Sequence, residues 1–148
     1  MTRARDLATL TDNTITTPLF ISPSEDLTIA ATSASATVNF DIKTQAILYY
    51  TSNASANFTL NFRGSSSETL NSIINTGESL TTSFLVTQGT TAYYPSAFKI
   101  DGSSVTPKWL GGTAPSAGNA SSIDAYSFTI IKTANATFVV LAGAARFV

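Results

Sequence analysis

The chain has 148 residues, 8 basic and 9 acidic, with a net charge of -1 and neither histidine nor cysteine. That length suits one domain, which buries roughly two-thirds of its unfolded surface. The missing residue types exclude disulfides, thiolate nucleophiles, a Ser-His-Asp triad and metal sites built on cysteine or histidine. Charged residues make up only 11% of the chain, under half of the roughly 25% typical of globular domains. The basic residues form no phosphate-binding cluster, so we expect no nucleic-acid partner.

The N-terminal residues predict an arm. Arg3, Arg5 and Asp6 interrupt the first 20 residues, so we expect no secretory signal, and no run approaches the roughly 20 apolar residues that cross a bilayer. We therefore expect a protein made in the cytosol, without a membrane partner. The stretch RARDLATL could form two helical turns with Leu7 and Leu10 on one face, which is too short to be stable alone. We interpret residues 1–22 as an arm that docks on a partner through Arg3, Arg5, Leu7 and Leu10.

From residue 27 onward, short runs rich in β-branched and aromatic residues alternate with Ser, Ala and Asn clusters. The expected strands are 27–30, 36–40, 46–51, 57–62, 79–87 and 97–100. This spacing is typical of a β-sandwich or barrel. Residues 69–74 could form either a strand or a helical turn. We find no repeat with the period of a solenoid and no linker that divides the chain.

The last apolar segment predicts a long hairpin, with strands at 123–132 and 137–142. Tyr126, Phe128 and Ile130 alternate with smaller residues along the first strand. We expect this hairpin to be the central pair of a sheet, buried on both faces, and residues 111–122 to be a flexible approach to it. Residues 23–148 are therefore predicted to form a single all-β domain, an antiparallel, jelly-roll-like β-sandwich.

The acidic residues give little indication of catalysis. The seven candidates beyond residue 22 are Glu25, Asp26, Asp41, Glu68, Glu78, Asp101 and Asp124. Glycoside hydrolysis needs two carboxylates about 5 to 10 Å apart, whereas these are scattered among turn-forming residues. The Asp-Gly-Ser sequence at 101–103 offers one carboxylate where calcium takes 6 to 8 oxygens, and no phosphate-binding loop occurs. We therefore expect no enzyme, no metal and no cofactor.

Three aromatic residues, Tyr93, Tyr94 and Trp109, have two possible interpretations. Aromatic rings in a β-sandwich commonly anchor a core or an interface. The same rings could instead stack on a sugar, so glycan binding through these residues stays open.

The string GGTAPSAGNASSIDAYSFTIIKTANATFVVLAG, residues 111–143, resembles a C-terminal module of virion proteins from tailed bacteriophages, notably those of marine cyanobacteria. In that module an aromatic residue precedes G-T-x-P-x-x-G-N, followed by S-I-D-x-Y-x-F-T-I-I-K-T and A-T-F-x-V-L-A. Trp109, Gly118, Asn119, Asp124 and Tyr126 are among the residues here that match it. The RARDLA opening is also similar to the start of many proteins from such virions.

The resemblance implies a non-enzymatic structural protein located in the virion. We expect a capsid decoration or cement protein that binds the major capsid protein or other virion proteins, as a homo-oligomer, specifically a trimer. The alternative that the resemblance leaves open is a tail-fibre or adhesin component that recognises host-surface glycan.

Overall fold

A computed structural model describes residues 23–148 as two packed β-sheets, one of six strands and one of four. The strands are β1 (Leu27–Ser33), β2 (Ala36–Asp41), β3 (Ile47–Ser52), β4 (Phe58–Arg63), β5 (Ser79–Thr87), β6 (Pro95–Ile100), β7 (Ser103–Ser104), β8 (Lys108–Trp109), β9 (Ile123–Ala134) and β10 (Thr137–Phe147). The helical turns are α2 (Leu70–Ile73) and η2 (Leu110–Gly112). The all-β sandwich is confirmed. The N-terminal arm and its proposed docking residues lie outside the described residues.

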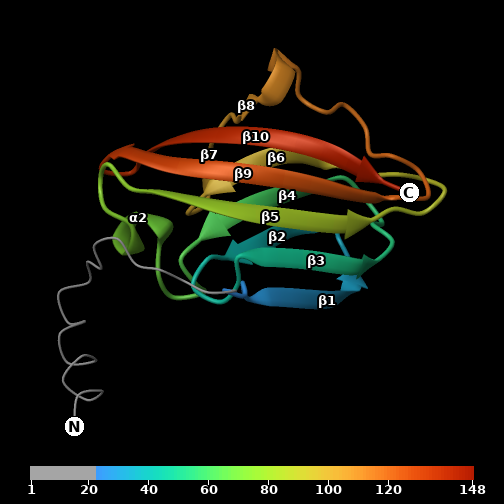
Figure 1. The fold of residues 1–148 in the computed structure, drawn as a ribbon, viewed down its shortest axis with the longest axis horizontal. Helices are drawn as coiled ribbons and strands as arrows, with labels where there is room; N and C mark the ends of the chain where they lie inside the picture. The colour runs from blue at the N-terminus through green and yellow to red at the C-terminus, as the bar shows by residue number, and fades with distance from the viewer. Residues whose placement is uncertain (1–22) are drawn as a thin grey trace, which may run out of the picture.

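The order of the strands corrects the expected antiparallel, jelly-roll-like pairing. The six-stranded sheet runs β1-β3-β5-β9-β10-β8 and the four-stranded sheet β2-β4-β6-β7 (Figure 1). Successive strands from β1 to β6 alternate between the two sheets, so the chain returns to each sheet in its previous direction. The pairs β1·β3, β3·β5, β2·β4 and β4·β6 are consequently parallel. A strand of the opposite sheet provides the crossover that parallel pairing requires.

From β1 to β6, each pair of consecutive strands, one in each sheet, forms one turn of a coil, and the first two turns share a four-residue sequence motif. The sequence Thr-Val-Asn-Phe in β2 lies beside Thr-Leu-Asn-Phe in β4, with Asn39 opposite Asn61 and Phe40 opposite Phe62. Asn61 Nδ2 donates to Asn39 Oδ1 at 2.8 Å, and the two phenylalanine rings pack with centroids 5.7 Å apart. Equivalent positions of successive turns therefore contact each other directly.

Small residues form the corners where the chain crosses between sheets. Ala34 and Ala54 are almost fully buried, and the N–H of Ser55 donates to Ala34 O at 3.1 Å. Ala54 N donates in turn to Thr87 O at 2.9 Å, at the end of β5. Backbone hydrogen bonds thus connect the corners of three successive turns.

Aromatic side chains fill the space between the sheets. The Phe62 ring of the four-stranded sheet lies edge-on to Phe128 of the six-stranded sheet, with centroids 5.0 Å apart. Phe58 and Phe84 make a second contact between the sheets at 5.5 Å. Such pairs contribute about 0.5–1.5 kcal/mol each beyond burial. The expected alternation of Phe58, Leu60 and Phe62 toward the core is confirmed.

The predicted hairpin is present and longer than expected, since β9 and β10 pair along almost their whole length. Tyr126, Phe128 and Ile130 point into the core. The expectation of burial on both faces is wrong: Ser127 and Leu141, which point the other way, are exposed. The ambiguous stretch at 69–74 forms α2, a single helical turn with Thr69 as its N-cap.

Candidate functional site

A buried hydrogen-bonded group lies at the start of β9, within the string that resembles the phage module. The Asp124 side chain is 1% exposed, and its carboxylate accepts from Asn119 Nδ2 at 2.7 Å and Asn119 N at 2.9 Å. Gln88 Nε2 also donates to this carboxylate, at 3.2 Å. We call Gln88, Asn119 and Asp124 the clasp, because they hold the β8–β9 connection against β9. This carboxylate, one of the seven candidates in the sequence, is therefore fully engaged with its own fold.

The clasp also fixes the connection between β5 and β6. Gln88 Oε1 accepts from Tyr93 N at 2.9 Å, while Gln88 Nε2 donates to Tyr93 O at 2.5 Å. Gly118 lies so close to this backbone that a Cβ built on it would be 2.3 Å from Tyr93 O. The segment expected to be a flexible approach, residues 111–122, is thus anchored at Gly118 and Asn119.

Tyr126 lies two residues beyond the clasp carboxylate and is 2% exposed. Burial raises the pKa of its phenol, and the negative charge of Asp124 raises that pKa further. The phenol therefore stays protonated throughout the neutral range.

A second group of polar contacts holds α2 at both ends. Asp101 accepts from Leu70 N at 2.6 Å and Asn71 N at 2.9 Å. Lys132, which is 6% exposed, donates from Nζ to Asn71 O at 2.5 Å and Ile74 O at 2.9 Å. A carboxylate at the N-terminus and an ammonium at the C-terminus satisfy backbone groups that a single helical turn leaves unpaired.

Most of the candidate carboxylates make contacts that hold the fold. Asp41 pairs with Arg63 at 2.5 Å, Glu68 with Lys43 at 2.5 Å, and Glu78 accepts from Asn75, while Asp101 and Asp124 act as described. Glu25 and Asp26 are exposed. Within residues 23–148, no three acidic side chains gather where they could hold a metal ion.

The three aromatic candidates come from two places in the fold. The Trp109 ring on β8 packs against Phe98, Tyr126 and Phe128, with centroids 5.7 to 6.4 Å apart. Tyr93 and Tyr94 lie on the β5–β6 connection, where Tyr94 N donates to Asn57 Oδ1 at 3.2 Å. Trp109 thus has a role in the core, and sugar binding by these rings stays a prediction.

The outward side of the six-stranded sheet is a feature that the sequence reasoning missed. We define the outer face as Leu27 and Ile29 of β1 together with the odd-numbered residues of β3, β5, β9 and β10, whose even-numbered neighbours lie on the opposite side of the sheet, the side that carries the core residues. None of these residues is charged. The charges of β9 and β10, Asp124, Lys132 and Arg146, are all at even positions. Period-2 alternation could have indicated this face, had the hairpin not been interpreted as buried on both sides.

Two hollows indent the outer face, and Leu110 of η2 lines both of them. One, of about 370 Å³, is lined by residues that include Lys108, Trp109, Thr129 and Leu141. The other, of about 280 Å³, is lined by residues that include Ser83, Ala145 and Phe147. Ser127 and Gly143 line both.

Comparison with known proteins finds no family model, curated protein or solved structure that matches this chain. The helices in residues 23–148 are all too short to span a bilayer.

Proposed function

We propose that this protein is a non-enzymatic structural component of a tailed-phage virion, and that it decorates the capsid. It binds the major capsid protein or a neighbouring virion protein as a trimer. A protein that binds only the intact shell stabilises the shell by mass action, without any chemical step.

The observation that carries the proposal is the way the resembling string folds. Gly118, Asn119 and Asp124 build the clasp, while Tyr126 and Phe128 enter the core. The residues that define the resemblance therefore serve architecture, which is the role expected of a module shared among structural proteins.

The experiment is to locate the protein on gradient-purified phage particles from its source, using an antibody raised against the recombinant chain and electron microscopy. Labelling distributed over heads is expected. Labelling confined to tail tips would favour a fibre instead, and particles without label would contradict a virion protein.

The docking role of the arm has its own test, on heads that lack the protein and are reloaded with the full chain. The double variant Arg3→Ala/Arg5→Ala should bind fewer copies per head than the wild type. The matched control, Lys99→Ala/Lys108→Ala, removes two positive charges from the strands and should bind normally. Equal loading by both variants would contradict docking through Arg3 and Arg5.

A second candidate function is glycan recognition by a fibre or adhesin component. The larger hollow favours it, because Trp109 and the polar residues Lys108, Ser127 and Thr129 all belong to its lining. Ser127→Arg places a long side chain in this hollow, and it should abolish binding on an array of host-surface glycans. A wild-type protein that binds no glycan on that array would contradict this function.

A further inference from the structure

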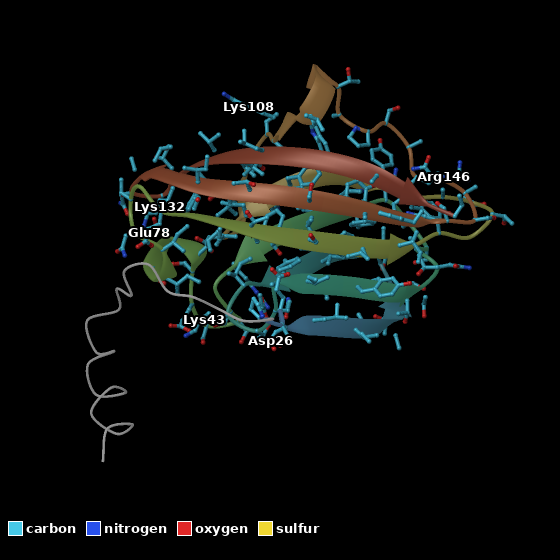
Figure 2. The ribbon with its side chains drawn as sticks, viewed as in Figure 1. Asp26, Lys43, Glu78, Lys108, Lys132 and Arg146 are labelled. Carbon is cyan, nitrogen blue, oxygen red and sulfur yellow. The ribbon has the colours of Figure 1, made fainter. Side chains whose placement is uncertain are left out.

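The two outward faces of the sandwich differ in charge. The four-stranded sheet presents the Asp41–Arg63 ion pair and Lys99 on its outer side, next to the hydrogen-bonded Asn39 and Asn61. The outer face of the six-stranded sheet has no charge on its five long strands. Figure 2 shows Asp26, Lys43, Glu78, Lys108 and Arg146 around the margin of the molecule in this view, whereas Lys132 is buried against α2. A polar margin around an uncharged centre is typical of a protein interface.

The uncharged face also holds most of the exposed apolar side chains. Leu27, Ile29, Leu141 and Phe147 are 48%, 63%, 43% and 58% exposed, and all four belong to this face. Its five long strands have 6 to 12 residues each. At about 4.8 Å between strands and about 3.3 Å per residue, they cover roughly 700 Å² of flat area. A standard stable interface buries about 800 Å² per partner, so this one face has nearly the required size.

The shape of the face fits a copy of itself. Leu110 is 87% exposed and projects beside the hollows of about 370 and 280 Å³ that Ser127 and Gly143 help to line. When a second copy meets the first across a twofold axis, the projecting leucine of each copy faces the hollow of the other, so the same contact forms twice.

We propose that the outer face of the six-stranded sheet packs against the same face of other copies of this chain. A second copy is the favoured occupant because it supplies an uncharged surface of the same area, together with the leucine that fits the hollow. A charged partner would lose its hydration over the centre of this face and gain no ion pair there. The inference does not depend on a virion location, because it concerns the purified chain alone.

The experiment measures the mass of the purified full-length chain by light scattering and sedimentation over a wide range of concentration. The wild type is compared with Ala145→Arg, which lies on β10 of the outer face and lines the smaller hollow, and with the matched control Ala97→Arg on the outer side of the four-stranded sheet. Both alanines are exposed, so neither change disturbs the core. Ser127→Arg is a second variant of the face, and it decides the result if Ala145→Arg does not fold.

The expected result is a wild-type mass of two chains, retained in Ala97→Arg and reduced to one chain in Ala145→Arg. Ala145→Arg should raise the dissociation constant of the oligomer at least tenfold, because the new arginine buries an unpaired charge at the contact between copies. A wild type of single-chain mass at all concentrations would overturn the proposal. An oligomer that persists in folded Ala145→Arg, or that is lost equally in Ala97→Arg, would also overturn it.

Discussion

Asn119 donates twice to the carboxylate of Asp124, from its side-chain Nδ2 to Oδ1 at 2.7 Å and from its backbone N to Oδ2 at 2.9 Å. This pairing holds the loop before β9 against the second residue of that strand. Because Gln88 joins the same carboxylate from the end of β5, one buried side chain organises two connections that lie far apart in the sequence.

Removing the charge of the clasp should destabilise the fold. Asp124→Asn replaces one acceptor oxygen with an NH2 group, so at least one donor from Asn119 or Gln88 loses its partner in a buried site. A cost of about 1–3 kcal/mol in the free energy of unfolding is expected. Urea denaturation followed by Trp109 fluorescence measures it. The control Asp26→Asn changes an exposed carboxylate and should have little effect, and equal stability of the two variants would contradict the role of the clasp.

Gly118 should not tolerate a side chain. In Gly118→Ala the added methyl group meets the backbone oxygen of Tyr93 at 2.3 Å, so the β5–β6 and β8–β9 connections must separate. Overpacking of this kind costs about 1–3 kcal/mol. Gly89→Ala is the matched control, because its nearest neighbour is the side chain of Asn53, at 3.0 Å, which can move. Thermal unfolding of the two variants compares them directly, and a smaller loss in Gly118→Ala would be inconsistent with this close contact.

Lys132 should contribute more to stability than an exposed lysine. Lys132→Met keeps most of the apolar stem but removes the ammonium that meets Asn71 O and Ile74 O, and we expect a loss of about 1–3 kcal/mol. Lys43→Met breaks the pair with Glu68, in which both side chains are nearly half exposed, and should cost at most about 1 kcal/mol. Urea midpoints of the two variants test the difference. Equal midpoints would show that α2 needs no ammonium at its C-terminal end.

Tyr126 should make the protein sensitive to alkaline pH. Burial and the charge of Asp124 raise the pKa of this phenol in the folded state, whereas an unfolded chain releases its proton near pH 10. The stability that depends on the neutral phenol is therefore complete below about pH 10 and declines as pH rises further.

In Tyr126→Phe we expect the free energy of unfolding to fall less steeply as pH rises. The slope should be smaller than in the wild type by the equivalent of up to one proton. Urea titrations at a series of pH values measure the two slopes. Below about pH 8 the wild type and the variant should give parallel curves, which serves as the internal control. An unchanged alkaline slope in Tyr126→Phe would exclude Tyr126 as the group responsible.

The sequence predicted where the longer strands lie, but neither the two-residue strands β7 and β8 nor which strands are neighbours. The expected strand at 79–87 and the alternation at Phe58, Leu60 and Phe62 agree with the structure, because burial of one face imposes period 2 on any strand. That period is the same for parallel and antiparallel pairing when one face is exposed. The repeated Thr-x-Asn-Phe at 37–40 and 59–62 indicated the coil, but in a chain so rich in Ser, Thr, Asn and Ala it was easily overlooked.

The clasp was only partly predictable. Asn119 and Asp124 stand five residues apart inside a recognisable string, whereas Gln88 contacts Asp124 across 36 positions and holds Tyr93 through backbone atoms that any residue provides. No local pattern marks such a glutamine. The outer face was missed for another reason, since a strand without charges has the same composition whether its second face is covered by its own chain or exposed.

The direct contact between equivalent positions of successive turns makes the sandwich extensible. Each turn adds one strand to both sheets. The strands β2 and β4 meet through matching Thr-x-Asn-Phe positions, whereas β6 places Ala97, Lys99 and Ile100 beside Thr59, Asn61 and Phe62. Insertion of one more copy of that turn would widen both sheets together and leave the hairpin of β9 and β10 intact. The two sheets can thus gain strands one turn at a time, without any change to the loops that hold the hairpin of β9 and β10.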